Sequence, residues 1–187
     1  MRKLKLQIQM TLDGFVGRTH GEMDWVNRNW DEEIGEYVTA ITEPVDCILL
    51  GRKLAESFIP HWAGQPANEP QSAIDKMNNT PKVVFSRSLE KSEWPNTSVT
   101  NGGLAHEVDR LKNQQGGDIM TYGGAGFASA LVWGNLIDEY HLFVNPSVIG
   151  QGMSIFGQVN GKNKLKLKSS QAFKCGIVVL CYEKLVQ

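Results

Sequence analysis

The chain has 187 residues, of which 41% are hydrophobic and 21% are charged, and its formal net charge is −1. This length fits one domain with a substantial core, and the composition is globular rather than disordered. The longest apolar runs, residues 47–50 and 176–181, are far shorter than the ~20 residues of a membrane helix. The N-terminus lacks the apolar core of a signal peptide. We therefore predict a single domain over residues 1–187, located in the cytoplasm.

The charge pattern argues against a nucleic-acid partner. Nineteen Lys and Arg residues balance 20 Asp and Glu residues, and neither sign forms a long run. The most basic stretch, residues 162–168, alternates Lys with Leu and is more simply the solvent face of a strand than a basic stripe. The cysteines lie inside apolar segments without CxxC spacing, which indicates buried thiols rather than a disulfide framework; they are Cys47, Cys175 and Cys181.

The predicted elements begin with a strand over residues 4–10, where Leu, Ile and Met alternate with Lys and Gln. A period of two indicates a strand with one buried face. A polar, glycine-containing stretch with two tryptophans follows over residues 18–30, and its length favours a lid or binding loop. Apolar residues recur at helical spacing over residues 32–41. Residues 47–50 form an apolar run typical of a strand buried on both faces.

The rest of the chain continues this alternation of strands and helices. In chain order we expect a helix over 54–58, a loop over 60–70, a strand over 82–86, a helix over 104–114, a strand over 118–122, a glycine turn over 123–126, a helix over 127–133, a strand over 137–144, a glycine-rich loop over 147–157, and an antiparallel pair over 165–168 and 173–183. Such alternation predicts an α/β fold with a mainly parallel sheet. The last two strands have no helix between them and add an antiparallel edge.

Residues suited to ligand binding follow four of the predicted strands. They are Asp13-Gly14, Gly51-Arg52, Ser86-Arg87 and Gly123-Gly124-Ala125-Gly126. In open α/β sheets, ligands bind beyond the carboxyl ends of the strands. Four such strand ends at one edge of a sheet predict an extended ligand.

Two features of these strand ends favour a ligand with several phosphates, such as NADP. The glycines at 123–126 open a helix, where phosphate can approach backbone N–H groups at the positive end of the helix dipole. Arg52 and Arg87 directly follow strands, and the planar guanidinium suits phosphate oxygens. The alternatives are a tight turn without ligand and two surface salt bridges. An ordinary Rossmann site is disfavoured because the sequence lacks GxGxxG, and no GxxxxGK[ST] is present.

Asp13 has three possible roles at the end of the first strand. Its carboxylate could accept hydrogen bonds from a ligand, donate a proton if its pKa is raised, or cap the turn before Gly14. Several aromatic residues could stack on a flat ring, although aromatic residues more often belong to the core; they are Trp25, Trp30, Trp62 and Phe127. The histidines are scattered, and we expect no metal site; they are His20, His61, His106 and His141.

Taken in order, several motifs resemble the dihydrofolate-reductase-like family. They are TLDGFVG at 11–17, DW at 24–25, ILLGRK at 48–53, VFSRS at 84–88, GGAG at 123–126 and LIDEYHL at 136–142. More narrowly, the chain resembles the group related to the C-terminal reductase domain of the riboflavin-biosynthesis bifunctional deaminase/reductase. The resemblance implies a three-layer α/β fold, NADPH along the carboxyl edge of the sheet, and a homodimer.

The resemblance also implies roles for individual residues. Those that would hold NADPH are Gly17, Gly51, Arg52, Lys53, Ser86, Arg87, Gly123, Gly124, Ala125, Gly126 and Phe127. Ser86 and Arg87 would meet the 2′-phosphate end. Phe15 and Trp25 would border the substrate, and Asp13, or a water that it holds, would supply a proton. Hydride transfer itself would need mainly positioning and a water-poor pocket.

The chain also departs from the patterns that it resembles. Residues 52–58 lack the Thr and the acidic-Pro-Leu segment of the riboflavin-pathway reductases, Tyr122 stands where those enzymes favour Glu, and the deaminase half is missing. The acid in the first helix of dihydrofolate reductases has only Glu32, Glu33 or Glu36 as a counterpart. We therefore keep three hypotheses: an NADPH-dependent reductase of a pyrimidine or pterin, resembling 5-amino-6-(5-phosphoribosylamino)uracil reductase; a non-catalytic NADP(H)- or nucleotide-binding protein; and a purely structural domain.

Overall fold

The computed structural model describes residues 1–159 and 163–185. Its elements are β1 (Leu4–Thr11), α1 (Glu32–Thr42), β2 (Val45–Gly51), α2 (Arg52–Ala63), α3 (Gln71–Asn79), β3 (Lys82–Phe85), β4 (Thr97–Thr100), α4 (Leu104–Lys112), β5 (Asp118–Thr121), α5 (Ala125–Trp133), β6 (Glu139–Asn145), β7 (Leu165–Ala172) and β8 (Val178–Lys184). None of these helices is both long enough and apolar enough to span a membrane.

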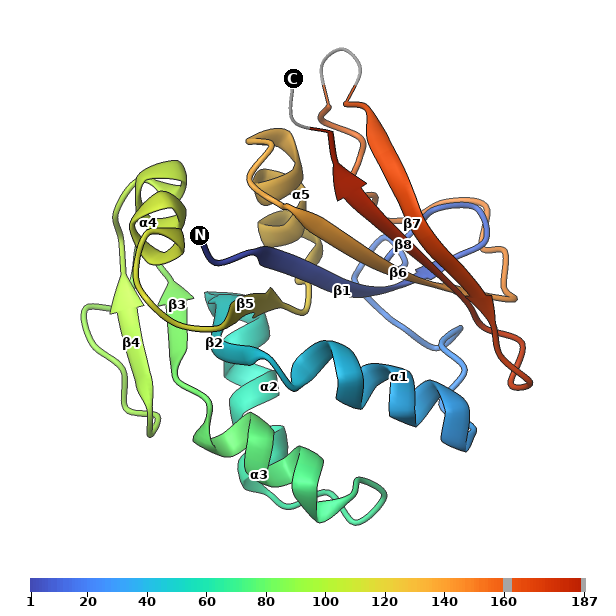
Figure 1. Cartoon of the computed structure of the whole chain (residues 1–187), viewed down its shortest axis with the longest axis horizontal. Coiled ribbons are helices and arrows are strands. Elements are labelled where there is room, and N and C mark those ends of the chain that lie inside the picture. Colours follow the sequence, from blue (N-terminus) through green and yellow to red (C-terminus); the bar gives the residue numbers. More distant parts are fainter. Residues whose placement is uncertain (160–162, 186–187) are drawn as a thin grey trace.

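The eight strands form one sheet in the order β4-β3-β2-β5-β1-β6-β8-β7. The pairs from β4 to β6 are parallel, whereas β8 pairs antiparallel with both β6 and β7. Helices α4 and α5 pack on one face of the sheet, and α1, α2 and α3 pack on the other (Figure 1). The predicted fold, a three-layer α/β structure with a mainly parallel sheet and an antiparallel C-terminal edge, is confirmed.

Strand β2 is buried on both faces, as its apolar run predicts. Ile48 and Leu50 pack with α2 and α3, whereas Cys47 and Leu49 point to the opposite face, which α4 and α5 cover. A parallel strand between helical layers has no solvent face, so it favours continuous apolar residues.

The prediction for β1 was wrong in one respect. The alternation indicated one buried face, yet seven of its eight residues are buried. Lys5 and Gln7 are only 7% and 8% exposed. The reason is the position of β1 between β5 and β6, in the middle of the sheet. Its polar side chains therefore face the layer that contains α1 and α2 rather than solvent.

Three elements differ from their prediction because their sequences are polar or interrupted. Helix α2 continues through Pro60 to Ala63, where a loop was expected. Pro60 lies near the C-terminal end of the helix, where only a short part of the helix remains to be disturbed by the lost N–H bond. Helix α3 was not predicted, since only Ile74 and Met77 in it are buried. Strand β4 was missed as well, because its four residues, Thr-Ser-Val-Thr, form a polar edge strand.

The C-terminal hairpin has a longer first strand and a shorter second strand than predicted. Strand β7 extends to Ala172 and β8 begins at Val178, so the turn replaces the start of the predicted second strand. Seven of the eight residues in β7 are exposed, consistent with a strand at the edge of the sheet. Lys162, the first residue of the lysine-leucine stretch, lies outside the described residues.

Candidate functional site

The carboxyl ends of β1, β2, β3 and β5 lie at one edge of the sheet, because these strands are parallel neighbours or near neighbours. The residues singled out in the sequence follow these ends. Asp13 comes after β1, Gly51 ends β2, Ser86 follows β3, and Gly123 comes shortly after β5. The structure thus brings the four predicted strand ends to one side of the molecule.

Two helix N-termini lie side by side at this edge. Gly51 is the N-cap of α2 and Gly124 is the N-cap of α5, and no described side chain caps either helix. The two helices approach closely, since a Cβ built on Gly51 would lie 2.8 Å from the Cβ of Phe127. The first N–H groups of an α-helix have no partner within the helix and attract anions. Two such sets of N–H groups next to each other form a suitable cradle for phosphates.

The turn before α5 depends on glycine. Gly123 and Gly124 have φ angles of +110° and +72°, in the left-handed region that other residues rarely adopt. Gly126, in the first turn of the helix, has open space where a Cβ would project. The ring of Phe127 packs against Phe85 at the end of β3, with a centroid distance of 5.3 Å. Phe127 therefore supports the cradle by packing between strand ends.

Ser86 and Arg87 have different environments. The Ser86 hydroxyl is buried and accepts hydrogen bonds from the N–H groups of Ser88 and Leu89, at 3.1 and 2.9 Å. These bonds fix the turn that carries Arg87. The Arg87 side chain is exposed, and it forms no ion pair with any of the residues that the structure describes. Its guanidinium is free to bind an anion at this edge.

Arg52 and Lys53 are on the first turn of α2. Arg52 pairs with Glu56 at 2.6 Å, which is the surface salt bridge considered as the alternative. An exposed pair of this kind contributes about 0.3–0.5 kcal/mol, so a phosphate could replace Glu56 at little cost. Lys53 is exposed. The cofactor roles of both residues stay predictions.

Asp13 joins two loops. Its carboxylate accepts hydrogen bonds from the N–H groups of Ile149 and Gly150, at 3.1 and 2.7 Å. A hydrogen bond from Thr11 and these backbone bonds hold the pKa of Asp13 below its ordinary value. A proton donor needs a raised pKa, so the geometry favours the hydrogen-bond acceptor. Thr11 provides the turn cap that was considered for Asp13, because its hydroxyl accepts a hydrogen bond from the Phe15 N–H at 2.9 Å.

The stretch predicted as a lid is anchored at both ends. Gly17 pairs with Met153 in an isolated bridge. At the other end, Asn27 bonds the side chain of Asn145 and the carbonyl of Cys175. Between these anchors, residues 19–24 are exposed, which limits any movable segment to about the first half of the predicted lid.

The two predicted substrate residues lie in this region, and their roles stay predictions. Phe15 is half-buried. Trp25 is 8% exposed, and its indole N–H is buried without a partner among the described residues.

The acids of the first helix do not reach the interior. Glu32, Glu33 and Glu36 are all exposed, and Glu33 pairs with Lys174 at 3.2 Å. The residue that α1 directs toward the sheet is Tyr37, whose hydroxyl lies 2.7 Å from Nδ1 of His141. A buried acid from this helix is therefore not available to a ligand.

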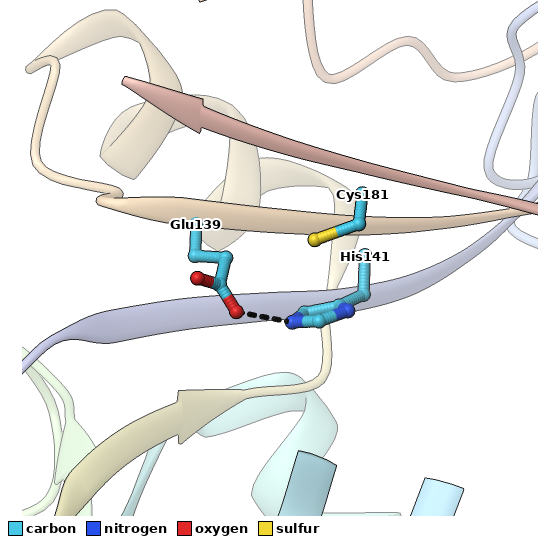
Figure 2. Close-up of side chains that lie close together, drawn as sticks. All are labelled: Glu139, His141 and Cys181. Carbon is cyan, nitrogen blue, oxygen red and sulfur yellow. Dashed lines mark hydrogen bonds and ion pairs between the residues drawn. The ribbon is translucent and has the colours of Figure 1, made fainter. Parts of the chain in front are cut away.

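A buried polar cluster beneath α1 was not foreseen. Glu139 and His141 on β6 lie beside Cys181 on β8 (Figure 2). The Glu139 carboxylate is 2.9 Å from Nε2 of His141 and 2.5 Å from the ammonium of Lys168. The sequence signal was the Glu-x-His spacing within an apolar strand, which places both side chains on one face.

The same three side chains could offer ligand atoms to a metal, because these atoms lie within 4.8 Å of one another. Glu139 and His141 are already bonded to other groups, however. The hydrogen bond from His141 and the pair with Lys168 hold the pKa of Glu139 far below its ordinary value. Burial raises the pKa of the Cys181 thiol, which disfavours the thiolate that binds metals. The cluster is best described as a self-contained ion and hydrogen-bond network.

Other buried polar atoms have no partner among the residues that the structure describes. These unpaired side-chain atoms are Gln7 Oε1, Trp25 Nε1, Thr121 Oγ1 and Tyr122 OH. Most buried polar groups in proteins are hydrogen-bonded, so such exceptions call for a reason. Sequence reasoning did not identify Gln7 as a site residue, because it looked like part of a solvent face.

The fold and the arrangement of strand ends agree with a family match that covers nearly the whole chain. Residues 2–179 match the family described as RibD C-terminal domain. The chain belongs to this family, which confirms the resemblance to the dihydrofolate-reductase-like group related to that domain.

Relatives and solved structures support the same assignment. The chain is 31% identical to the uncharacterized protein YyaP of Bacillus subtilis (strain 168), over 97% of this chain and 94% of that protein. Its fold is similar to a pyrimidine reductase-like protein from Corynebacterium diphtheriae, with a TM-score of 0.67 and 13% identity over 100% and 93% of the two chains. It is also similar to the diaminohydroxyphosphoribosylaminopyrimidine deaminase/5-amino-6-(5-phosphoribosylamino)uracil reductase from Thermotoga maritima, with a TM-score of 0.70 and 15% identity over 98% of this chain and 57% of that one.

Proposed function

We propose that this protein is an NADPH-dependent reductase of a small heterocycle of the pyrimidine or pterin type, acting as a cytoplasmic homodimer. The observation that carries the proposal is the pair of helix N-termini at Gly51 and Gly124, with the exposed Arg87 at the same edge of the sheet. Membership of the RibD C-terminal domain family supports a reductase-like function related to riboflavin biosynthesis.

In this proposal the chain binds and orients the two reactants. The free N–H groups of α2 and α5 hold the pyrophosphate, and Arg87 binds the 2′-phosphate. NADPH, when bound, supplies the hydride. Gly17 lets the chain pass close to the nicotinamide, and Phe15 and Trp25 border the substrate. Asp13 stays ionised, keeps the two loops together and orients a water that delivers the proton.

A second candidate is a protein of the same fold that binds NADP(H) without turnover. The lowered pKa of Asp13 favours it, because the acid at the proposed site is a poor proton donor. One measurement distinguishes the two candidates. NADPH that binds tightly but is not oxidised in the presence of any pyrimidine or pterin substrate would support the second candidate.

The first test is a titration of the protein with NADPH, followed by nicotinamide fluorescence, with NADH as the comparison. We expect selective binding of NADPH. Arg87→Ala should weaken NADPH binding by about 1–3 kcal/mol and leave NADH binding unchanged, because a charge-assisted contact to the 2′-phosphate is lost. Lys166→Ala, an exposed cation on β7, is the matched control. Equal affinity of the wild type for both cofactors would contradict the role of Arg87.

A further inference from the structure

The central strand β1 has an unusual polar face. Lys5, Gln7 and Gln9 alternate along it and point to the side of the sheet that α1 and α2 cover, since the register partner of Lys5 is Met120, which packs with α2. Central strands of parallel sheets are normally apolar on both faces. Lys5 pairs with Asp118 at 2.7 Å, and Gln9 accepts a bond from Asn145 at 2.8 Å. Gln7, between them, has a buried oxygen with no partner in the described chain.

A second unpaired group lies next to Gln7. Leu6 is in register with Thr121, the last residue of β5. Tyr122 directly follows β5 and packs against the cluster that contains Met120, so it lies on the same face of the sheet as Lys5 and Gln7. The ring of Tyr122 stacks on Phe58 of α2, with centroids 5.2 Å apart and an interplanar angle of 24°. Its hydroxyl is buried without a partner in the described chain. Adjacent strands are about 4.8 Å apart, so the two side chains start from neighbouring strand positions on this face.

The position of the pair connects it with the cofactor edge. Tyr122 directly precedes Gly123 and Gly124, which form the turn before α5. On this face, α1 packs over β6 and β8, and α2 packs over β2 and β3. Strands β1 and β5 lie in the middle of the sheet, between the strands that the two helices cover (Figure 1). Gln7 is on β1 and Tyr122 directly follows β5.

Neighbouring protein groups do not satisfy the pair. His141 is in register with Gln7, but both of its ring nitrogens are occupied, by Glu139 and by Tyr37. An unpaired buried donor or acceptor is costly. Two of them side by side, next to a predicted cofactor site, are expected where a ligand supplies the missing bonds.

We propose that Gln7 and Tyr122 recognise the edge of an uncharged heterocycle in which a ring N–H stands beside a carbonyl group. Tyr122 donates its hydroxyl hydrogen to the carbonyl oxygen, and the Gln7 side-chain oxygen accepts the ring N–H. The inference rests on the proposed function, because it names residues that select the substrate of that site. Burial raises the pKa of Tyr122, which keeps the phenol protonated. The exposed acids of α1 supply no carboxylate for a cationic ring.

Pteridine-2,4-dione and its 1,3-dimethyl derivative form a matched pair of probes, since methylation removes the ring N–H groups and keeps the carbonyls. Binding of each to the NADPH-saturated protein is followed by probe fluorescence. We expect the wild type to bind the unmethylated compound at least about tenfold more tightly, because a site that hydrogen-bonds an N–H rejects the analogue without it. In Gln7→Leu this preference should fall to about twofold or less. Tyr122→Phe should instead weaken the binding of both probes, because both keep the carbonyl that the hydroxyl bonds, and NADPH affinity should stay unchanged in both variants.

The outcomes separate this inference from the proposed function. If NADPH fails to bind the wild type, the proposed function is wrong, and the probes are then tested on the cofactor-free protein. If NADPH binds but the wild type does not discriminate between the two probes, if Gln7→Leu keeps the wild-type preference, or if Tyr122→Phe binds both probes as tightly as the wild type, the inference is overturned. Tyr122→Phe removes a single hydroxyl group that has no partner among the described residues, so its effect on the affinity for both probes keeps the inference testable should Gln7→Leu fail to fold.

Discussion

Two groups of buried polar side chains lie on the same face of the sheet, and they differ in whether their hydrogen bonds are satisfied. In the first group, Glu139 bonds both His141 and Lys168, and His141 in turn bonds Tyr37. In the second group, Gln7 Oε1 and Tyr122 OH are buried with no partner among the described residues. His141 and Gln7 are register neighbours, so the two groups adjoin.

The difference indicates separate roles for groups with similar burial. A network that satisfies its own members stabilises the fold and leaves nothing for a ligand. Unpaired polar atoms reduce stability, and a protein retains them where function requires them. We therefore assign the first group, which ties β6 to α1 and β7, to structure, and the second group to recognition.

Removing the charge of Glu139 should have the largest effect. Glu139→Gln breaks the pair with Lys168 and weakens the bond from His141, and we expect a loss of about 2–3 kcal/mol in the free energy of unfolding. This is less than the 3–5 kcal/mol of a fully buried pair, because the Lys168 side chain is 36% exposed and can turn to solvent. Urea unfolding of the wild type and of Glu139→Gln measures this loss.

Glu183→Gln is the matched control for that experiment. Glu183 pairs with Lys166 at 3.1 Å on the exposed hairpin, and such pairs contribute about 0–1 kcal/mol. Equal losses for the two variants would contradict the structural role of the Glu139 network.

The same network predicts a dependence of stability on pH. The pKa of Glu139 lies below its ordinary value of 4.5, so the folded state holds the ionised form. Its contribution is complete above pH 4.5 or so and is lost progressively as the pH falls further. Between pH 6 and pH 3 we expect the wild type to lose about 1–2 kcal/mol more than Glu139→Gln, measured by urea unfolding. If the free energy of unfolding fell in parallel with pH in the two proteins, the folded state would not favour the ionised form of Glu139.

The elements with regular apolar patterns were predictable, and the polar ones were not. The apolar run of β2 and the helical spacing of α1 predicted both elements to within a few residues. Helix α3 buries only Ile74 and Met77, too few residues to show a period. The alternation in β1 is the same for an edge strand with a solvent-exposed face and for a central strand whose polar face is buried. Its place in the sheet decides between them.

Within the candidate site, the local features were predictable and the distant contacts were not. Chain order alone places Gly51 and Gly124 between a strand and a helix, although the helices begin at Arg52 and Ala125, two residues earlier than predicted. The largest cause of the lowered pKa of Asp13 is the nearby Thr11 side chain. Its further partners, Ile149 and Gly150, are far along the chain, so these contacts depend on tertiary structure. The neighbourhood of Gln7 and Tyr122 likewise depends on the pairing of β1 with β5.

The smallest predicted effects are changes in the free energy of unfolding that have opposite signs in the two groups. Tyr37→Phe and Tyr122→Phe each remove one hydroxyl from a buried ring. Tyr37→Phe should lower the free energy of unfolding by about 1 kcal/mol, because it leaves Nδ1 of His141 unpaired. Tyr122→Phe should raise it by about 0.5–1 kcal/mol, because the lost hydroxyl has no partner in the described chain and its burial only costs free energy.

Thermal and urea unfolding of the two variants beside the wild type test this pair of signs. A loss of stability in Tyr122→Phe would mean that its hydroxyl is already bonded in the ligand-free protein, and the comparison between the two groups would fail. A gain in stability together with weaker binding of both heterocycles would identify Tyr122 as a residue kept for recognition at the expense of the fold. A loss of stability in Tyr37→Phe would show that replacing a buried tyrosine by phenylalanine does not stabilise this core in general.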